Sequence, residues 1–346
     1  MRLNIKWKVL IGILIPVVVL YFLLTRHTTV VKLPIKDGLH CNTTLGQSHE
    51  KNLEKIRTYM FSKAEPYLKS LFVEVDDNKM PDVPVFVTAF SSSHFSEGQD
   101  LIKNVNSVAR KQFPSAKFFI YDIGLSSSHQ KQILSDCNCE IKPFDFTSLP
   151  AHVSIMKGYA WKPLVIQSAA KQHPFVVWMD ASVRFTTRDL KNEFKDVQRV
   201  GVKASEGYAP IAVRTHPNTF RFLQEEACAF KELNEFEATF IMIYGTKFVS
   251  EFLLRPWVSC ALAEGCLVPD HSPSEYINCD NPTVYFDCHR FDQSVLSILL
   301  HRMYSKDIEE HKMKHEFYKF CKGADEIPFV PQFLNKIYSH YYEKCM

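Results

Sequence analysis

The chain has 346 residues, which is enough for one large domain or two small ones. Its composition, 46% hydrophobic and 23% charged, is that of an ordinary folded protein. The formal net charge is only +3. That value argues against a dedicated nucleic-acid binder, because such proteins usually carry a concentrated basic face.

The first residues predict a membrane anchor. Basic residues precede an uncharged apolar run from Val9 to Leu24, which lies just below the usual spanning length of about 17–25 residues. A cleaved signal peptide is the alternative, but the residues that follow offer no small-x-small cleavage site. Positive charge before the span favours a cytoplasmic N-terminus. We therefore expect a cytoplasmic tail at 1–8, a transmembrane signal anchor at 9–25 and a lumenal body.

Two further features agree with a lumenal body. Asn42 begins the only N-x-S/T acceptor for N-glycosylation, shortly past the predicted span. The chain has ten cysteines, which we expect to pair in an oxidising lumen, and half of them fall within 260–321. A zinc site at Cys279, Cys288 and His289 is the rival interpretation, although the sequence has no C-x-x-C pair.

A polar stem is expected between the anchor and the folded body. Residues 26–80 are mixed in character, and the apolar spacing within 50–72 predicts one or two stem helices. The body, 81–346, opens with a continuous apolar run from Val83 to Phe90 that predicts a buried strand. A helix is then expected from Gly98 to Gln112.

The same alternation continues along the chain. Strands are expected within 116–125, 139–146 and 174–185, and helices within 126–136 and 156–172, the second with Pro163 at a first helical position. Apolar strands that alternate with helices predict an α/β fold with a mostly parallel twisted sheet flanked by helices. Ligands of such sheets bind beyond the carboxyl ends of the strands. Two of these ends carry acids, Asp122 and Asp180, so both are expected at a ligand crevice.

The pattern becomes mixed after Phe185. A hairpin is expected within 201–217, a strand within 236–246, and helices within 218–233, 248–263 and 290–305. We therefore divide the body into a nucleotide-binding half, 81–185, and an acceptor-binding half, 186–346.

Several common chemistries lack their motifs in this chain. There is no phosphate loop, no dinucleotide glycine motif, no serine elbow and no H-E-x-x-H zinc helix. For a lumenal α/β domain without these motifs, glycosyl transfer from a nucleotide sugar is the main remaining function.

Five segments together carry a family resemblance: WMDASVRF, YAWKPLVIQ, FEATF, RPWVSCALAEGCLVP and CHRFDQSVLSILL. They resemble an uncharacterised group of nematode type II membrane proteins, which is associated with the nucleotide-diphospho-sugar transferases of the GT-A fold. The resemblance covers roughly residues 83–305. It implies a GT-A-like fold and, less directly, a reaction on nucleotide sugars.

Enzymes of the GT-A type place a D-x-D motif at the end of a central strand. One acid meets the ribose, and the other binds a divalent cation that neutralises the diphosphate. The matching triplet here is Asp180-Ala181-Ser182, so a hydroxyl replaces the second acid. The resemblance therefore implies Mn²⁺ or Mg²⁺ at Asp180, but serine ligates magnesium weakly compared with a carboxylate. Arg184 or Lys162 would supply positive charge instead.

The expected nucleotide-sugar contacts are Asp122, Lys162, Asp180, Ser182 and Arg184. Lys162 precedes Pro163 at a predicted helix start, where backbone N–H groups favour anions. Each residue also has a plain structural interpretation, because acids close turns after strands and most lysines are solvated.

Two further acids are candidates for catalysis. Glu237 lies at the mouth of a predicted strand, and Asp292 lies where a helix begins. A general base must take a proton from an acceptor hydroxyl near the anomeric carbon, so one carboxylate in the crevice is required. Asp292 has the alternative of a helix N-cap.

Three functions remain open. The first is a type II glycosyltransferase of the Golgi or ER that moves a sugar from a nucleotide sugar to a glycan or glycoprotein, with no nucleic-acid partner. The second is a non-catalytic lumenal protein on the same fold that binds a glycan or a partner enzyme. The third is another α/β transferase such as a methyltransferase, which the missing glycine-rich loop after Phe90 disfavours.

Overall fold

A computed structural model describes residue 45 and residues 48–186, 189–269, 277–279 and 284–321. The predicted anchor at 9–25 and the acceptor Asn42 lie outside this part of the chain. None of the described helices combines the length and apolarity that a membrane crossing requires.

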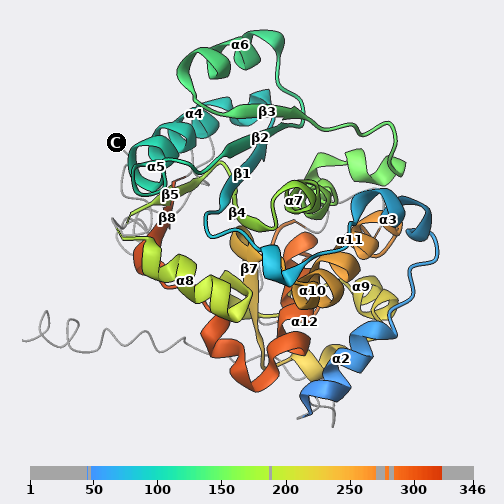
Figure 1. The fold of residues 1–346 in the computed structure, drawn as a ribbon. Coiled ribbons are helices and arrows are strands. Elements are labelled where there is room, and N and C mark those ends of the chain that lie inside the picture. The colour runs from blue at the N-terminus through green and yellow to red at the C-terminus, as the bar shows by residue number, and fades with distance from the viewer. Residues whose placement is uncertain (1–44, 46–47, 187–188, 270–276, 280–283, 322–346) are drawn as a thin grey trace, which may run out of the picture. The chain divides into compact units, whose positions relative to one another are not determined.

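The described residues build a six-stranded sheet in the order β3-β2-β1-β4-β7-β6 (Figure 1). Its strands are β1 (Val85–Phe90), β2 (Phe118–Asp122), β3 (Glu140–Pro143), β4 (Phe175–Met179), β6 (Val202–Pro210) and β7 (Asn234–Tyr244). β1, β2, β3 and β4 are parallel to one another, as expected, whereas β7 runs antiparallel to both β4 and β6. The sheet is therefore mixed. The hairpin expected within 201–217 is wrong, because β6 pairs with β7 instead.

The strand expected within 174–185 is interrupted at its acid. β4 ends at Met179, and the chain turns where the Val183 amide donates to the Asp180 carbonyl at 3.0 Å. A short strand, β5 (Val183–Phe185), then leaves the main sheet and pairs with β8 (Tyr318–Phe320). This break places Asp180 in a turn at the carboxyl end of β4, an interior strand of the sheet.

Helices cover both faces of the sheet. They are α2 (His49–Arg57), α3 (Glu65–Leu71), α4 (Phe95–Asn104), α5 (Arg110–Gln112), α6 (Ser127–Asp136), α7 (Trp161–Gln172), α8 (Lys191–Val200), α9 (Pro217–Phe222), α10 (Lys247–Val249), α11 (Arg255–Leu262) and α12 (Asp292–Tyr304). Apolar residues of α4, α6 and α8 join the core on one face, and those of α7, α11 and α12 join the core on the other. Figure 1 shows α4 and α8 on one side of the sheet and α7 and α11 on the other.

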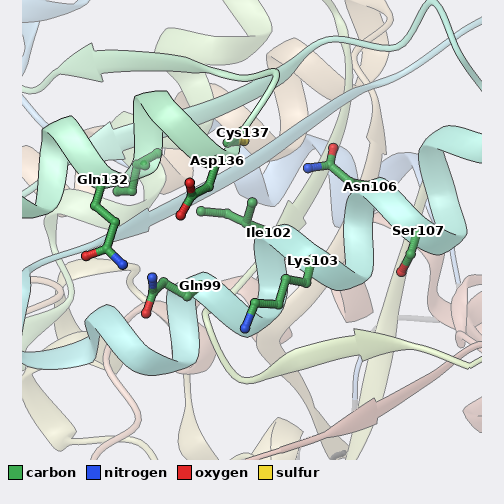
Figure 2. A pocket seen from close by; sticks show the side chains of 9 residues that line it. Gln99, Ile102, Lys103, Asn106, Ser107, Gln132, Asp136 and Cys137 are labelled. Atoms are coloured by element: carbon green, nitrogen blue, oxygen red, sulfur yellow. The ribbon is translucent and has the colours of Figure 1, made fainter.

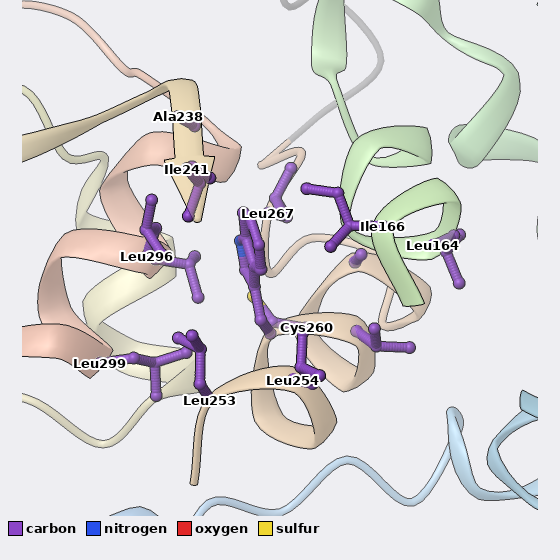
Figure 3. Packing of buried hydrophobic residues seen from close by; sticks show 14 of the residues in the cluster. Leu164, Ile166, Ala238, Ile241, Leu253, Leu254, Cys260, Leu267, Leu296 and Leu299 are labelled. Carbon is purple, nitrogen blue, oxygen red and sulfur yellow. The ribbon is translucent and has the colours of Figure 1, made fainter. Parts of the chain in front are cut away.

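The alternation of β4 explains the two cores. Val176 and Trp178 face α7, α11 and α12, whereas Phe175, Val177 and Met179 face the other helix layer. Figure 3 shows the first core, with Ile166 of α7, Ile241 of β7 and Leu296 of α12 converging on one interior. Parallel strands covered on both faces need such continuous apolar runs.

The predicted stem, 26–80, includes two helices that pack on this body. Ile56 of α2 and Leu68 of α3 are buried in the same core as α7 and α12. The amphipathic spacing that predicted the helices is thus satisfied by the folded body, since a helix buries its apolar stripe wherever a partner surface is available.

Some helix boundaries differ from the predictions. The helix expected from Gly98 begins earlier, at Phe95, and continues through a π-helical turn before α5. Helix α7 begins at Trp161, so Pro163 is its third residue and Lys162 lies within its first turn. The helix expected within 218–233 is only α9 followed by a 3₁₀ turn.

The expectation that cysteines pair is confirmed for three bridges within the described residues. They are Cys137–Cys139, Cys260–Cys266 and Cys279–Cys288. The last bridge shows that the rival zinc interpretation is wrong, because two of the proposed thiolate ligands are joined in a disulfide.

Gly98 marks the closest approach of α4 to the sheet. A Cβ atom added there would lie 2.5 Å from Cζ of the buried Phe90 ring. We expect Gly98→Ala to destabilise the fold by about 1–3 kcal/mol through overpacking, despite the better helix propensity of alanine. Urea unfolding measures this, with the exposed Ser96→Ala on the same helix as control. Equal stability of Gly98→Ala and wild type would contradict this packing.

Candidate functional site

The sheet has a topological switch point between β1 and β4. From β1 the chain moves outward through β2 to β3, and β4 then lies on the other side of β1. The two strands separate at their carboxyl ends, where open α/β sheets bind their ligands. Asp180 follows β4 directly, and residues 91–94 follow β1. His94 lies close enough to favour the charged form of Asp180, so both strand ends meet at this edge.

Lys162 lies between two carboxylates at this edge. Its Nζ is 3.1 Å from Oδ1 and 3.2 Å from Oδ2 of Asp180, and 3.1 Å from Oδ2 of Asp292. It also donates to the Ala238 carbonyl at 3.3 Å. The side chains of Lys162 and Asp292 are 4% and 5% exposed, whereas that of Asp180 is 29% exposed. Asp180 is therefore the member of the group that a ligand can reach.

Burial and charge act against each other in this group. Burial raises the pKa of Asp292 to about 6, although the Lys162 ammonium lowers it. Burial also raises the pKa of Asp180, again against Lys162. For Lys162, burial lowers the pKa, but the two carboxylates outweigh burial and raise it overall. The ammonium thus stays charged, while Asp292 is close to its titration range at neutral pH.

Tryptophans and strained turns hold these side chains in place. The Trp178 indole donates to Asp180 Oδ1 at 3.0 Å, and the Trp257 indole donates to the Asp292 carbonyl at 3.0 Å. Tyr159 and Phe291, which precede α7 and α12, have positive φ angles of 52° and 46°. Non-glycine residues rarely adopt this conformation, and such strain concentrates at functional sites.

A second charged group lies along β7. Glu235 is buried and accepts from Arg214 and Gln293, each at 2.6 Å. Glu237 accepts from the Ser205 hydroxyl at 3.2 Å. Burial and the neighbouring Glu235 raise the pKa of Glu237 to about 7. A carboxylate with this pKa is suited to general-base chemistry near neutral pH.

Glu235 is a residue that the sequence analysis missed. Gly207 leaves room for it, since an added Cβ atom would lie 2.4 Å from Cγ of Glu235. The signal was present in the E-x-E spacing of Glu235 and Glu237, because alternate residues of a strand share one face. The charge of Arg290 acts on both Glu237 and Tyr159, where it lowers the pKa of each.

The side chains of two predicted ligand contacts, Asp122 and Arg184, have partners within the protein. Asp122 Oδ1 accepts from the amides of Gly124 and Leu125 at 2.8 and 2.6 Å, and Oδ2 accepts from Gln130 at 2.6 Å. These bonds make Asp122 a turn residue that closes β2.

Ser182 and Arg184 lie on the chain that leaves the sheet after β4. The buried Arg184 donates to the carbonyls of Ala181, Val183 and Glu97, at 2.6, 2.7 and 3.0 Å. The Ser182 carbonyl accepts from the Cys321 amide at 2.7 Å. Arg184 thus ties the turn after β4 to α4, and its hydrogen bonds do not include Asp180.

His289 is also structural. It is fully buried, its Nδ1 accepts from the His216 amide at 3.1 Å, and its Nε2 lies 3.0 Å from the Leu267 carbonyl. Burial lowers the pKa of His289 to about 3.

His289 therefore predicts a loss of stability in acid. Below about pH 6.5 the unfolded imidazole takes up a proton that the folded one refuses until about pH 3. We expect stability to fall with pH across this window, by up to about 1.4 kcal/mol per pH unit for this group. In His289→Gln the free energy of unfolding by urea should change less between pH 7 and pH 5. The exposed His49→Gln is the control, and equal slopes in wild type and His289→Gln would refute the assignment.

The residues around Asp180 do not fit a resident divalent metal. The described residues hold no group of three or more His, Cys, Asp or Glu side chains that could bind one. The space between the two nearest carboxylates, Asp180 and Asp292, is taken by the Lys162 ammonium. The chain therefore places a fixed cation where two acids converge.

A pocket of about 360 Å³ lies elsewhere in the described part of the chain. It opens between α4 and α6, where Gln99 and Lys103 face Gln132 and Asp136 (Figure 2). None of the predicted site residues lines it. We therefore place the candidate site at the strand ends and their charged groups, because the volume of a pocket alone does not indicate a reaction.

One known protein family matches part of the chain. Residues 48–167 match the family described as "Protein of unknown function (DUF1647)". No curated protein sequence shows significant similarity to this chain.

Solved structures that resemble the chain are glycosyltransferases. Mouse xyloside xylosyltransferase 1 is 11% identical, with a TM-score of 0.42 over 71% of this chain and 99% of that protein. The mannosyltransferase Ktr4p of S. cerevisiae is also 11% identical, with a TM-score of 0.40 over 75% and 77% of the two chains. The bifunctional enzyme WbbM is 15% identical, with a TM-score of 0.35 over 54% of this chain, which spans only 36% of WbbM.

Proposed function

We propose that this chain binds a nucleotide sugar beyond the carboxyl ends of β1 and β4 and transfers the sugar to a hydroxyl of a glycan or glycoprotein. The observation that carries this proposal is Asp180 itself. Its carboxylate lies at the switch point, is oriented by Lys162 and Trp178, and is open to a ligand. A fixed, reachable carboxylate is a good acceptor for the hydroxyls of a sugar or ribose.

The diphosphate has a matching place at the start of α4. This ten-residue helix continues from a 3₁₀ turn, Ser92–His94, that follows β1, and no side chain caps the start of the turn or of the helix. Uncapped N–H groups and the helix dipole favour an anion there. The diphosphate on α4 and a sugar hydroxyl on Asp180 would span the switch point between the two strands.

Glu237 is the proposed general base. As the acceptor oxygen bonds to the anomeric carbon, its proton passes to the Glu237 carboxylate, and the bond from that carbon to the phosphate oxygen breaks. The nucleoside diphosphate then leaves with the bonding electron pair. Asp292 suits this role less well, because its side chain is 5% exposed and ion-paired with Lys162. We assign Asp292 to the positioning of Lys162.

We also propose that the body acts in the lumen of the Golgi or ER, held by the anchor predicted at 9–25. The three disulfides of the described residues support an oxidising compartment. Protease protection of the body in sealed microsomes tests this placement, and digestion without detergent would contradict it.

The reaction is tested by incubating the full chain with a panel of UDP- and GDP-sugars, with and without Mn²⁺. Release of the nucleoside diphosphate is expected from at least one donor, and Asp180→Asn should abolish it. Asp145→Asn is the matched control, because this exposed acid caps only its own turn. A non-catalytic binding protein would bind a donor or glycan without release, and equal release by Asp180→Asn would refute the site.

A further inference from the structure

We infer that Lys162 fills the place that a divalent cation would take between Asp180 and Asp292, so that ligand binding in this crevice needs no divalent metal. That the ligand is a nucleotide sugar rests on the proposed function. The position of the built-in cation does not, since it follows from the contacts of one side chain.

The ammonium of Lys162 is surrounded by oxygen atoms of three residues. It lies within 3.3 Å of both Asp180 oxygens, of Asp292 Oδ2 and of the Ala238 carbonyl. The rings of Tyr159 and Trp178 lie 5.2 and 5.8 Å from Nζ, which adds cation–π attraction. Two of these contacts are hydrogen bonds, to Asp180 Oδ2 and to the Ala238 carbonyl. The Asp292 carboxylate is held by charge alone, since its Oδ2 has no hydrogen-bond partner among the described residues.

A divalent ion would compete for the same space. Mg²⁺ lies about 2.0–2.1 Å from its oxygen ligands, and Ca²⁺ about 2.3–2.6 Å. An ion held by both carboxylates would therefore displace Nζ from between them. The displaced Lys162 charge would stay buried without a partner, which is strongly unfavourable.

Among the residues that the structure describes, no group of metal-binding side chains compensates for that loss. A hard cation needs about six oxygen ligands in near-regular geometry, and Ser182 adds only a neutral hydroxyl where a third acid would help. The two acids that would form a metal site are thus already paired with the Lys162 ammonium.

The first test measures Mn²⁺ binding by the full chain with electron paramagnetic resonance. We expect wild type and Asp180→Asn to bind the same amount of Mn²⁺, because the site is already filled. Lys162→Ala should gain one bound Mn²⁺, and the double variant Lys162→Ala/Asp180→Asn should lose it again. A wild-type Mn²⁺ site that disappears in Asp180→Asn would overturn the inference, and this comparison does not need the Lys162 variant to fold.

The second test measures the binding of UDP- and GDP-sugars to the full chain by calorimetry. Equal affinity in EDTA and in Mn²⁺ supports the inference, and a donor that binds only with Mn²⁺ overturns it. If no nucleotide sugar binds in either condition, the proposed function is refuted. The Mn²⁺ comparison between wild type and Asp180→Asn then still decides whether Lys162 fills the cation place.

Discussion

Lys162→Met is expected to destabilise the folded chain by about 3–5 kcal/mol, because it removes one partner of a buried ionic group. Asp180 and Asp292 would face each other without the ammonium that lies 3.1 Å from each. Methionine keeps most of the volume of the side chain, so the loss reports charge and hydrogen bonding more than packing. Urea unfolding at neutral pH measures the change.

The matched control for this variant is Lys171→Met on the same helix. Lys171 is exposed and bonds only the Ser70 carbonyl, so its loss should cost little. The deficit of Lys162→Met should also shrink as the pH falls. The Lys162 ammonium lowers the pKa of Asp292, which is about 6 in wild type, so its removal raises that pKa further. The variant therefore takes up the proton, and regains stability, at a higher pH than wild type does. A loss equal to that of Lys171→Met would show that the group is not a buried ionic network.

Glu237→Gln is expected to lower kcat by about 10²–10⁴ with little change in KM, because an amide cannot accept the acceptor proton. The pH profile carries the sharper signature. Since the pKa of Glu237 is about 7, the base forms only as the pH rises through 7. The wild-type rate should therefore climb over this range and then level off, and the climb should be absent in Glu237→Gln.

Glu206→Gln on the neighbouring strand β6 is the control for this variant. Glu206 pairs with Lys312 at 2.8 Å and has no partner in the Asp180 group. Its loss should leave kcat and the pH profile unchanged. A normal kcat in Glu237→Gln would remove this residue from the reaction and leave Asp180 without an identified base.

The position of Asp180 was predictable because it depends on local sequence. A run of buried apolar residues that ends in an acid predicts a strand leaving the core, and strands alternating with helices predict where that end lies. The same reasoning predicted a ligand contact at Asp122, but the carboxylate of Asp122 accepts hydrogen bonds from the nearby residues Gly124 and Gln130. Pattern alone does not separate a turn acid from a ligand acid, because both follow strands.

The partners of Asp180 were not predictable in the same way. Lys162 and Asp292 meet it only because α7 and α12 pack on one face of the sheet beside β7. Both residues were singled out at helix starts, yet the ion pairs between them depend on tertiary packing that sequence spacing does not encode. Arg184 shows the converse, since its position in the triplet suggested a ligand and its bonds go to carbonyls.

Hydrophobic periodicity also did not predict the antiparallel pairing of β6 with β7. β6 and β7 are joined with register shifts after Ala204 and after Glu206. Such irregularities disturb the alternation that identifies strands and concentrate next to active sites. Glu235 and Glu237 lie together on one face of β7, near the carboxyl ends of the parallel strands. Their E-x-E spacing in the sequence indicates this shared face.

A crystal structure of the full chain with a nucleotide sugar that it binds tests the central claim most directly. We expect the ligand beyond β1 and β4, with a sugar or ribose hydroxyl on Asp180, the diphosphate at the start of α4 and Lys162 still between its two carboxylates. A ligand bound between α4 and α6, with the Asp180 edge empty, would contradict it.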